Sequence, residues 1–250
     1  MIGVSGSHGF IGSKLVARLR QLGKRVIALD RSGYIPPGID YVYDLAAYGN
    51  LYGQDEIGEI YEANVARVAR ELRWAKEVKR FIYMSTSSVM LPQQTFYSLS
   101  KKAAEDMVML WGGYEKSTIV RPYTVYGPGG YSGHLIPKLF DSCLNGTPMP
   151  FVEDAVHDFI FIDDVVNALI LLEKHQLSMV ELGTGVGTTN EEVKNIVEKV
   201  TRKKANIKPV DNLRTYDTHN WVAKITGLSF FAWEPQVKLE EGIRRIYETQ

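Results

Sequence analysis

The chain has 250 residues, equal numbers of basic and acidic side chains at 29 each, and a single cysteine, Cys143. Proteins that bind nucleic acid or a membrane surface through charge usually carry a basic excess, so neither partner is expected. A lone cysteine excludes an internal disulfide and suits the reducing cytoplasm. No apolar stretch approaches the ~20 residues that cross a bilayer. Because Met1 leads straight into a predicted strand, no signal peptide is expected.

The chain opens with a short apolar strand followed by three glycines spaced three apart, Gly6, Gly9 and Gly12. Glycine backbone can turn tightly and can touch a ligand closely, because no Cβ intervenes. Apolar spacing predicts a helix from Phe10 to Leu22, with Gly23 at its C-terminal cap. The glycines therefore join a strand to a helix N-terminus, which is a natural binding site for an anion.

Strands and helices alternate through the first half of the chain. We expect strands at 25–30, 41–47, 80–85 and 117–121, and helices at 53–77 and 97–111. This alternation predicts an α/β fold with a doubly wound parallel sheet covered by helices on both faces.

The second half is less regular, and a strand expected at 179–182 returns to the sheet. Helices are expected at 135–144, from Asp163 or Asp164 to 174, from an Asn190 cap to about 201, and at 239–247. We therefore expect interleaved domains. One is a dinucleotide-binding domain of residues 1–128, with return segments near 155–184, and the other a substrate-binding lobe of 129–154 and 185–250.

Asp30 closes the strand that follows the glycine loop, 18 residues after Gly12. A carboxylate at this place can bond the ribose diol of a dinucleotide, which favours NAD over its 2′-phosphorylated form. Arg31 leaves NADP open as the less favoured alternative, because a guanidinium can receive a 2′-phosphate. A glycine loop that only packs a helix, followed by a surface Asp, is the simpler alternative.

Tyr97 and Lys101 lie four residues apart on a predicted helix and so project from one face. A free tyrosine has a pKa of about 10, and a neighbouring ammonium lowers it by stabilising the phenolate. Beside a dinucleotide, such a pair can move a hydroxyl proton while hydride passes to the nicotinamide. The same spacing occurs on solvated helix faces, and the hydroxyl cluster 85–88 can be ordinary turn chemistry or can hold a substrate oxygen.

The order of these motifs resembles the extended short-chain dehydrogenase/reductases, and within them the NAD-dependent nucleotide-sugar epimerase/dehydratase group. The resemblance covers nearly the whole chain. It rests on the glycine loop, Asp30, Leu45-Ala-Ala47, Asn64, Ser85-Thr86, Tyr97-x-x-x-Lys101, Arg121-Pro122, Val125-Tyr-Gly-Pro128, His157-Asp-Phe159, Asp163-Asp164, Trp233-Glu-Pro and Leu239-Glu-Glu-Gly-Ile243.

The resemblance implies a Rossmann fold and a role for each matched residue. The implied catalytic residues are Thr86, Tyr97 and Lys101. The implied cofactor-binding residues are Gly6, Gly9, Phe10, Ile11, Gly12, Asp30, Arg31, Leu45, Ala46, Ala47, Tyr97, Lys101, Pro122 and Tyr123. The implied substrate-binding residues are Thr86, Ser87, Thr124, His157 and Arg214. No metal is expected, because the five histidines show no metal-ligand spacing.

The sequence also departs from the family. Ten residues separate Asp30 from Tyr41, where the family places a helix, a strand and another helix. We therefore expect the sheet to lack one edge strand and the adenine pocket to have a thin wall. Asp44 stands where the family usually has histidine, and His157 takes the place of an arginine that often contacts substrate phosphates.

These features predict an NAD-dependent epimerase or oxidoreductase that acts on a nucleotide sugar by transient oxidation of a ring hydroxyl. Ser87 and Ser88 stand where the family's dehydratases carry an acidic pair, so 4-epimerisation is expected rather than dehydration. Two alternatives stay open: an NAD(P)-dependent keto-sugar reductase with exchangeable cofactor, and a dinucleotide-binding sensor without turnover.

Helices 53–77 and 97–111 are apolar on more than one side, which indicates that more than one face of each is buried. The family pairs these helices across a dyad, so the resemblance implies a homodimer. Burial under the C-terminal lobe is the alternative.

Overall fold

The computed structural model describes residues 1–51, 53–211, 220–225 and 227–249. The chain divides into two compact units, each considered by itself. The first unit comprises Met1–Pro122, Val165–Glu181 and Thr226–Trp233, and the second Tyr123–Asp164, Leu182–Ile225 and Glu234–Gln250. Within the described residues, no helix has the combination of length and apolar character that crossing a bilayer requires.

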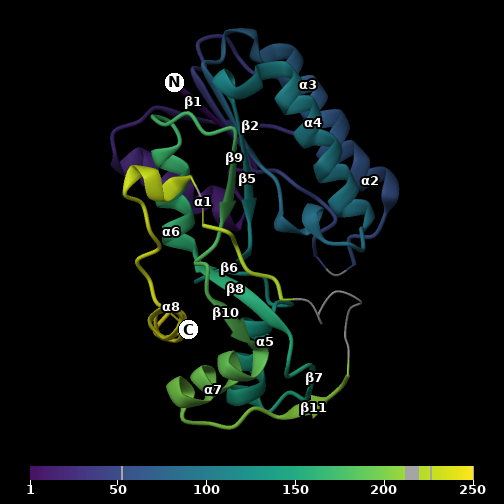
Figure 1. The fold of residues 1–250 in the computed structure, drawn as a ribbon, viewed down its shortest axis with the longest axis vertical. Helices are drawn as coiled ribbons and strands as arrows, with labels where there is room; N and C mark the ends of the chain where they lie inside the picture. The colour runs from purple at the N-terminus through teal and green to yellow at the C-terminus, as the bar shows by residue number, and fades with distance from the viewer. Residues whose placement is uncertain (52, 212–219, 226, 250) are drawn as a thin grey trace. The chain divides into compact units, whose positions relative to one another are not determined.

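Six described strands form the sheet of the first unit, in the order β2-β1-β3-β4-β5-β9 (Figure 1). Strands β1 to β5 pair in parallel, with Ile2 opposite both Val26 and Tyr41. The strands are β1 (Ile2–Ser5), β2 (Val26–Leu29), β3 (Tyr41–Asp44), β4 (Arg80–Met84), β5 (Ser117–Pro122) and β9 (Met179–Leu182).

Helices cover both faces of this sheet. Helix α1 (Phe10–Gln21) and most of α6 (Ile162–Leu171) lie on one face, and α3 (Arg67–Trp74) and α4 (Phe96–Lys116) lie on the other (Figure 1). The amide of Gly23, which has a φ of 74°, bonds the Arg20 carbonyl and closes α1 as expected. The doubly wound parallel fold is therefore confirmed.

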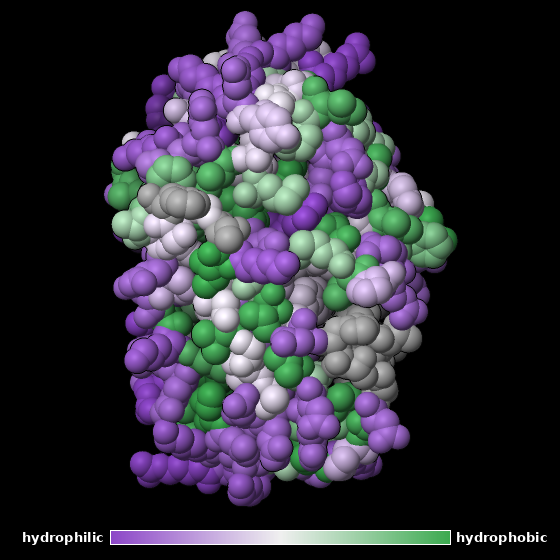
Figure 2. Space-filling model, in the orientation of Figure 1, coloured by the Kyte–Doolittle hydropathy of each residue, from purple (hydrophilic) through white to green (hydrophobic). Residues whose placement is uncertain are grey.

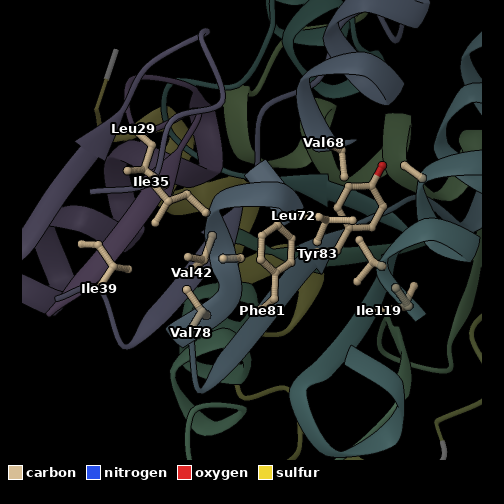
Figure 3. Packing of buried hydrophobic residues seen from close by; sticks show 13 residues of the cluster. Leu29, Ile35, Ile39, Val42, Val68, Leu72, Val78, Phe81, Tyr83 and Ile119 are labelled. Carbon is tan, nitrogen blue, oxygen red and sulfur yellow. The ribbon is translucent and has the colours of Figure 1, made fainter. Parts of the chain in front are cut away.

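The segment between β2 and β3 is as short as the sequence suggests. Residues 30–40 contain no helix or strand, and β2 is an edge of the sheet among the described strands. Ile35 and Ile39 are each 3% exposed and join Leu29 and Val42 in a core that continues to Phe81 (Figure 3). Two apolar anchors thus replace the usual helix–strand–helix unit, and the missing edge strand is confirmed.

The helix expected at 53–77 differs from the prediction. It begins at Ile57 and is divided into α2 (Ile57–Tyr61), a π-helical turn η1 (Glu62–Ala66), α3, and a 3₁₀ turn η2 (Ala75–Glu77). Asn64 lies in the π turn, accepts from the Tyr48 amide at 3.0 Å and donates to the Tyr48 carbonyl at 2.7 Å. Single π-helical turns within α-helices are often found at functional sites.

Helix α4 starts at a reciprocal capping box between Thr95 and Ser98. Its regular geometry is interrupted at Gly113, which has a φ of 54° and a ψ of −153°, and a short further turn follows to Lys116. The pair Gly112-Gly113 therefore ends the regular helix, as the sequence predicts.

The second unit is built on short strands that the sequence did not predict. They are β6 (Thr124–Tyr126), β8 (Val156–Phe161) and β10 (Gly187–Thr189), which form one sheet, and β7 (Met149–Phe151) and β11 (Ile207–Pro209), which form another. Its helices are α5 (Leu135–Asn145), α7 (Asn190–Thr201) and α8 (Leu239–Tyr247). Thr189, rather than Asn190, caps α7.

Two shorter features complete the described elements. The 3₁₀ turns η3 (Ser87–Met90) and η4 (Leu228–Phe231) both belong to the first unit. In the second unit, Gly242 allows α8 to pack closely, because a Cβ at this position would lie 2.3 Å from the Tyr126 hydroxyl.

Candidate cofactor and catalytic site

The predicted residues of the first unit follow neighbouring strands. The sheet order places the carboxyl ends of β2, β1, β3 and β4 side by side. These strands lead into Asp30, Gly6, Leu45 and Ser85 respectively. Open parallel sheets bind ligands at the carboxyl ends of their strands. The candidate residues therefore lie where this fold usually binds a ligand.

The glycine loop is bare main chain packed against main chain. Gly6 has a φ of 69°, and a Cβ on it would lie 2.8 Å from the backbone of Leu45 and Ala46. A Cβ on Gly12 would lie 2.1 Å from the Gly6 carbonyl oxygen. The N-cap of α1 is Gly9, which has no side chain to bond the first amides of the helix. The amides of Phe10, Ile11 and Gly12 are thus available to a phosphate.

The segment after β3 forms the opposite side of this cradle. Leu45 donates its amide to the Ser5 carbonyl at 3.2 Å, and Ala46 donates to the Asp44 carboxylate at 3.3 Å. Leu45 and Ala46 are half-buried and Ala47 is exposed. The two loops therefore approach backbone to backbone, which leaves no room for side chains between them.

Asp30 and Arg31 are exposed at the end of the edge strand β2. The hydroxyl and the amide of Ser32 both donate to one Asp30 oxygen, Oδ1. These hydrogen bonds lower the pKa of the Asp30 carboxyl, so it is ionised at neutral pH. The other carboxylate oxygen, Oδ2, does not take part in these two hydrogen bonds. A charged carboxylate of this kind is suited to accept hydrogen bonds from a ribose diol.

Thr86 and Tyr97 come together at the end of β4. Thr86 caps η3, and its hydroxyl lies 2.9 Å from the Ser88 hydroxyl. Tyr97 lies in the first turn of α4 and is half-buried. Burial raises the pKa of the Tyr97 phenol, and a hydrogen bond with Thr86 acts in the opposite direction. In the cofactor-free protein Tyr97 is therefore a protonated phenol.

Lys101 lies one turn further along α4 and is 1% exposed. Its Nζ lies 4.2 Å from the centre of the Tyr83 ring and has no hydrogen-bond partner among the described residues. Burial lowers the pKa of Lys101 to about 7, and nearby Asp44 opposes that shift. A buried amine without a partner fits a site that a ligand completes, because such a group is otherwise costly.

The remaining predicted residues divide between the two units. Ser87 is buried beside Thr86, and Pro122 ends β5 in the first unit. Tyr123, Thr124 and His157 belong to the second unit. Arg214 lies outside the described residues, and no group of potential metal ligands occurs among the described ones.

Within the second unit, Thr124 lines a pocket that sequence reasoning missed. Other lining residues are Tyr126, Gly130, His134, Ile136, Phe159 and Ile246. Beside His157, the buried Asp158 accepts from the amides of Thr184, Gly185 and Ala223 at 2.7, 2.8 and 3.1 Å. Asp158 thus connects β8 to the segments that contain Thr184 and Ala223. In the sequence, its place in the His157-Asp-Phe motif is the one sign of such a role.

Comparisons with known proteins agree with this geometry. The family model described as NAD dependent epimerase/dehydratase family matches residues 2–183. An Arabidopsis thaliana trifunctional UDP-glucose 4,6-dehydratase/UDP-4-keto-6-deoxy-D-glucose 3,5-epimerase/UDP-4-keto-L-rhamnose-reductase is 28% identical, in an alignment that covers 84% of this chain and 36% of that protein. UDP-glucuronate 4-epimerase of Thermodesulfobacterium geofontis is 25% identical, over 83% of this chain and 71% of that one.

Among solved structures, MoeE5 in complex with UDP-glucuronic acid and NAD superposes with a TM-score of 0.87 at 26% identity, over 99% of this chain and 98% of that chain. The chain spans only 29% and 36% of the length of the first two curated relatives that it matches. The family model covers most of the chain, and the bare glycine cradle and the partnerless Lys101 amine fit the cofactor that the family is named for. The chain belongs to the NAD-dependent epimerase/dehydratase family.

Proposed function

We propose that this protein is an NAD-dependent epimerase of a nucleotide sugar, which oxidises a ring hydroxyl transiently and reduces it again on the other face. The observation that carries the proposal is the hydroxyl pair of Thr86 and Tyr97, with the partnerless amine of Lys101 one turn further along α4, at the carboxyl end of the sheet that also carries the glycine cradle. A proton-transfer group beside a dinucleotide site is what reversible alcohol oxidation requires.

Each of these side chains has a distinct task in the proposal. Bound NAD supplies the hydride acceptor and donor. Tyr97 takes the proton from the sugar hydroxyl and later returns it. Thr86 holds the reacting oxygen against the Tyr97 phenol. Lys101, when protonated, lowers the pKa of that phenol and bonds the ribose hydroxyls of the cofactor.

The substrate class follows from the relatives. MoeE5 is solved with UDP-glucuronic acid, and the Thermodesulfobacterium geofontis relative is a UDP-glucuronate 4-epimerase. We therefore propose a UDP-sugar, with Thr124, His157 and Arg214 among its binding residues. Ser87 and Ser88 provide no carboxylate for eliminating water, which favours 4-epimerisation over dehydration.

A keto-sugar reductase is the second candidate, and the exposed setting of Asp30 favours it. An epimerase that must keep its keto intermediate profits from a firmly held cofactor, whereas a reductase exchanges cofactor in each cycle. Asp30 and Arg31 are both exposed, and no helix or strand lies between β2 and β3. NAD that stays with the protein through gel filtration would support the epimerase, and NAD that is lost would support the reductase.

We also propose a homodimer formed through α2 and α4. Leu99 and Leu110 of α4 are 45% and 88% exposed, and Ile57 and Tyr61 of α2 are 46% and 38% exposed. Figure 2 shows hydrophobic and hydrophilic residues side by side over this part of the first unit. Sedimentation velocity should show a dimer that Leu110→Glu converts to a monomer, and a wild-type monomer would contradict the proposal.

The reaction is tested by incubating the protein and NAD with a panel of UDP-sugars and separating the products. The expected result is a C4 epimer without net NADH. Tyr97→Phe should keep NAD affinity while turnover falls by about 10²- to 10⁴-fold, the usual contribution of a general acid/base. NAD binding without turnover on any sugar nucleotide would instead indicate a sensor.

A further inference from the structure

Four polar side chains form a buried cluster beneath the glycine loop. Ser5 ends β1, Asp44 ends β3, and Arg67 and Glu71 lie one turn apart on α3; all four are at most 3% exposed. Asp44 is one of the positions at which the sequence departs from its family. The cluster connects the two strand ends that lead into the cofactor cradle.

Arg67 is the centre of this cluster. Its Nη2 lies 2.8 Å from Asp44 Oδ1, and its Nη1 lies 2.5 Å from Glu71 Oε1. The Ser5 hydroxyl donates to the same Glu71 oxygen at 2.5 Å. The guanidinium fork therefore bridges two carboxylates, one belonging to β3 and one bonded to β1, which a lysine ammonium could not do with the same geometry.

The cluster also reaches the cradle itself. Arg67 Nη2 donates to the Ala46 carbonyl at 3.2 Å, while Asp44 Oδ1 accepts from the Ala46 amide at 3.3 Å. The backbone of Leu45 and Ala46 is the surface that Gly6 approaches. The same few side chains thus hold both strand ends that lead into this backbone contact.

Helix α3 supports the adenosine side as well. Arg70 Nε donates to the Ser32 carbonyl at 2.8 Å, two residues beyond Asp30. Gly33, with a φ of 77°, lies so close to α3 that a Cβ on it would be 2.9 Å from the Arg67 carbonyl. With the usual helix–strand–helix unit absent, α3 contacts the shortened segment directly.

Stability alone does not explain a charged cluster here. Burying ions costs several kcal/mol each, and apolar side chains of similar volume often replace such clusters without loss. The cost is visible at Glu71, whose pKa is raised to about 7 by burial and by nearby Asp44. Apolar side chains would fill the same space, but they would not fix the direction of a backbone carbonyl and amide at Ala46.

We propose that Arg67, held by Asp44 and Glu71, is a positioning residue for the cofactor: it sets the spacing between the glycine loop and the 45–47 segment, the two loops that would line the site of the dinucleotide diphosphate. The inference concerns the cofactor site of the family and does not depend on which sugar the protein converts.

The test removes the charges together, because Arg67→Met alone would leave two buried carboxylates without a partner. The triple variant Asp44→Asn/Arg67→Met/Glu71→Gln keeps the size of each side chain and buries no ion. We expect a protein that still folds, with NAD and ADP both bound about tenfold more weakly, the effect of one lost charge-assisted hydrogen bond. An equal loss of affinity for NAD and for ADP indicates that the variant weakens binding of the diphosphate, which both ligands have, rather than of the nicotinamide, which only NAD has.

Amide hydrogen exchange of the cofactor-free protein gives a second readout. Residues 6–12 and 45–47 should exchange faster in the triple variant, while the core of β4 stays protected. Arg73→Met is the matched control, because Arg73 lies on the same helix and is exposed; its NAD affinity should equal that of the wild type.

A folded triple variant with wild-type NAD and ADP affinity would overturn the proposal. Arg67→Lys covers the case in which the triple variant fails to fold, since it keeps the buried positive charge but lacks the fork. Weaker NAD binding by a folded Arg67→Lys supports the proposal, and unchanged binding refutes it. Binding, not turnover, is measured throughout, so an error in the proposed reaction would not affect the result.

Discussion

The two halves of the proposed cofactor site, one for the diphosphate and one for the adenosine, differ in how they are built. The diphosphate half is main chain packed against main chain, with a buried ionic cluster underneath. The adenosine half is an exposed carboxylate on a short loop at the edge of the sheet. The first half has no space for a Cβ at Gly6 or Gly12, whereas the Asp30 carboxylate of the second half is exposed and its hydrogen bonds come from Ser32, two residues away. Mutations should therefore couple stability to binding in the first half and separate them in the second.

Gly12→Ala should break the diphosphate half with the largest effect. The new Cβ would lie 2.1 Å from the Gly6 carbonyl oxygen, so β1 and α1 must separate. We expect a loss of roughly 1–3 kcal/mol in the free energy of unfolding, as for other overpacked sites, and no measurable NAD binding. Gly58→Ala is the control, because no described atom lies within 4 Å of a Cβ at that helical position. Wild-type NAD affinity in a folded Gly12→Ala protein would show that the loop is not the diphosphate site.

Ile35→Ala tests whether the short segment of the adenosine half depends on its apolar anchor. Ile35 is 3% exposed in the core cluster, and truncating such a side chain costs about 2–4 kcal/mol. Urea denaturation should show this loss. Tyr34→Ala, at a neighbouring residue that is 45% exposed, should change stability much less. Equal losses in both variants would mean that the segment has no specific anchor.

Lys101→Met separates stability from activity within the site. Because burial lowers the pKa of Lys101 to about 7, the unfolded chain binds more protons than the folded protein between about pH 7 and the ordinary lysine pKa of 10.5. The cofactor-free protein should therefore gain stability from this group as the pH rises through that window. Removing the amine should stabilise the protein by roughly 1–3 kcal/mol at pH 7, with turnover lost.

Denaturation of Lys101→Met at pH 7 and pH 9 checks the sign. The difference from the wild type should shrink at the higher pH, where the buried amine is neutral. Lys102→Met, which removes an ammonium that is only half-buried, provides the comparison. A stabilisation of Lys101→Met that grows between pH 7 and pH 9 would contradict the assigned direction.

Asp30→Asn should have the smallest effect on the fold. The amide oxygen can still accept from the Ser32 amide, so the unfolding midpoint should not change. NAD should bind about tenfold more weakly, because a charge-assisted bond to the ribose diol is lost, and the preference for NAD over NADP should fall. If the preference for NAD over NADP did not change, the choice between the two cofactors would depend on Arg31 or on another group. Titration calorimetry with both cofactors measures this difference.

The sequence predicts an element correctly where the residue type or the spacing is typical of a single structure. Gly23 closes α1, the ends of β9 and α8 fall where they were expected, and the short segment after Asp30 predicts the missing edge strand. The order of the motifs indicates the family. The boundaries of the substrate lobe and the roles of individual site residues stay predictions.

Other features follow from tertiary contacts that no local pattern reveals. In the π turn, Asn64 bonds the backbone of Tyr48, 16 residues away in sequence. Arg67 and Glu71 are typical of a solvated helix face, and only the folded chain shows that they meet Asp44. Three-residue strands in the second unit are too short for periodicity to detect.

The missing strand also affects how one molecule could associate with another copy of itself. Strand β2 carries its hydrogen-bonding groups at a rim of the sheet, and such rims invite pairing with another chain. Here the rim is only four residues long and follows Lys24 and Arg25, both exposed. A short edge strand flanked by positive charges disfavours pairing with the edge of another chain, so the missing strand need not make the protein prone to aggregate.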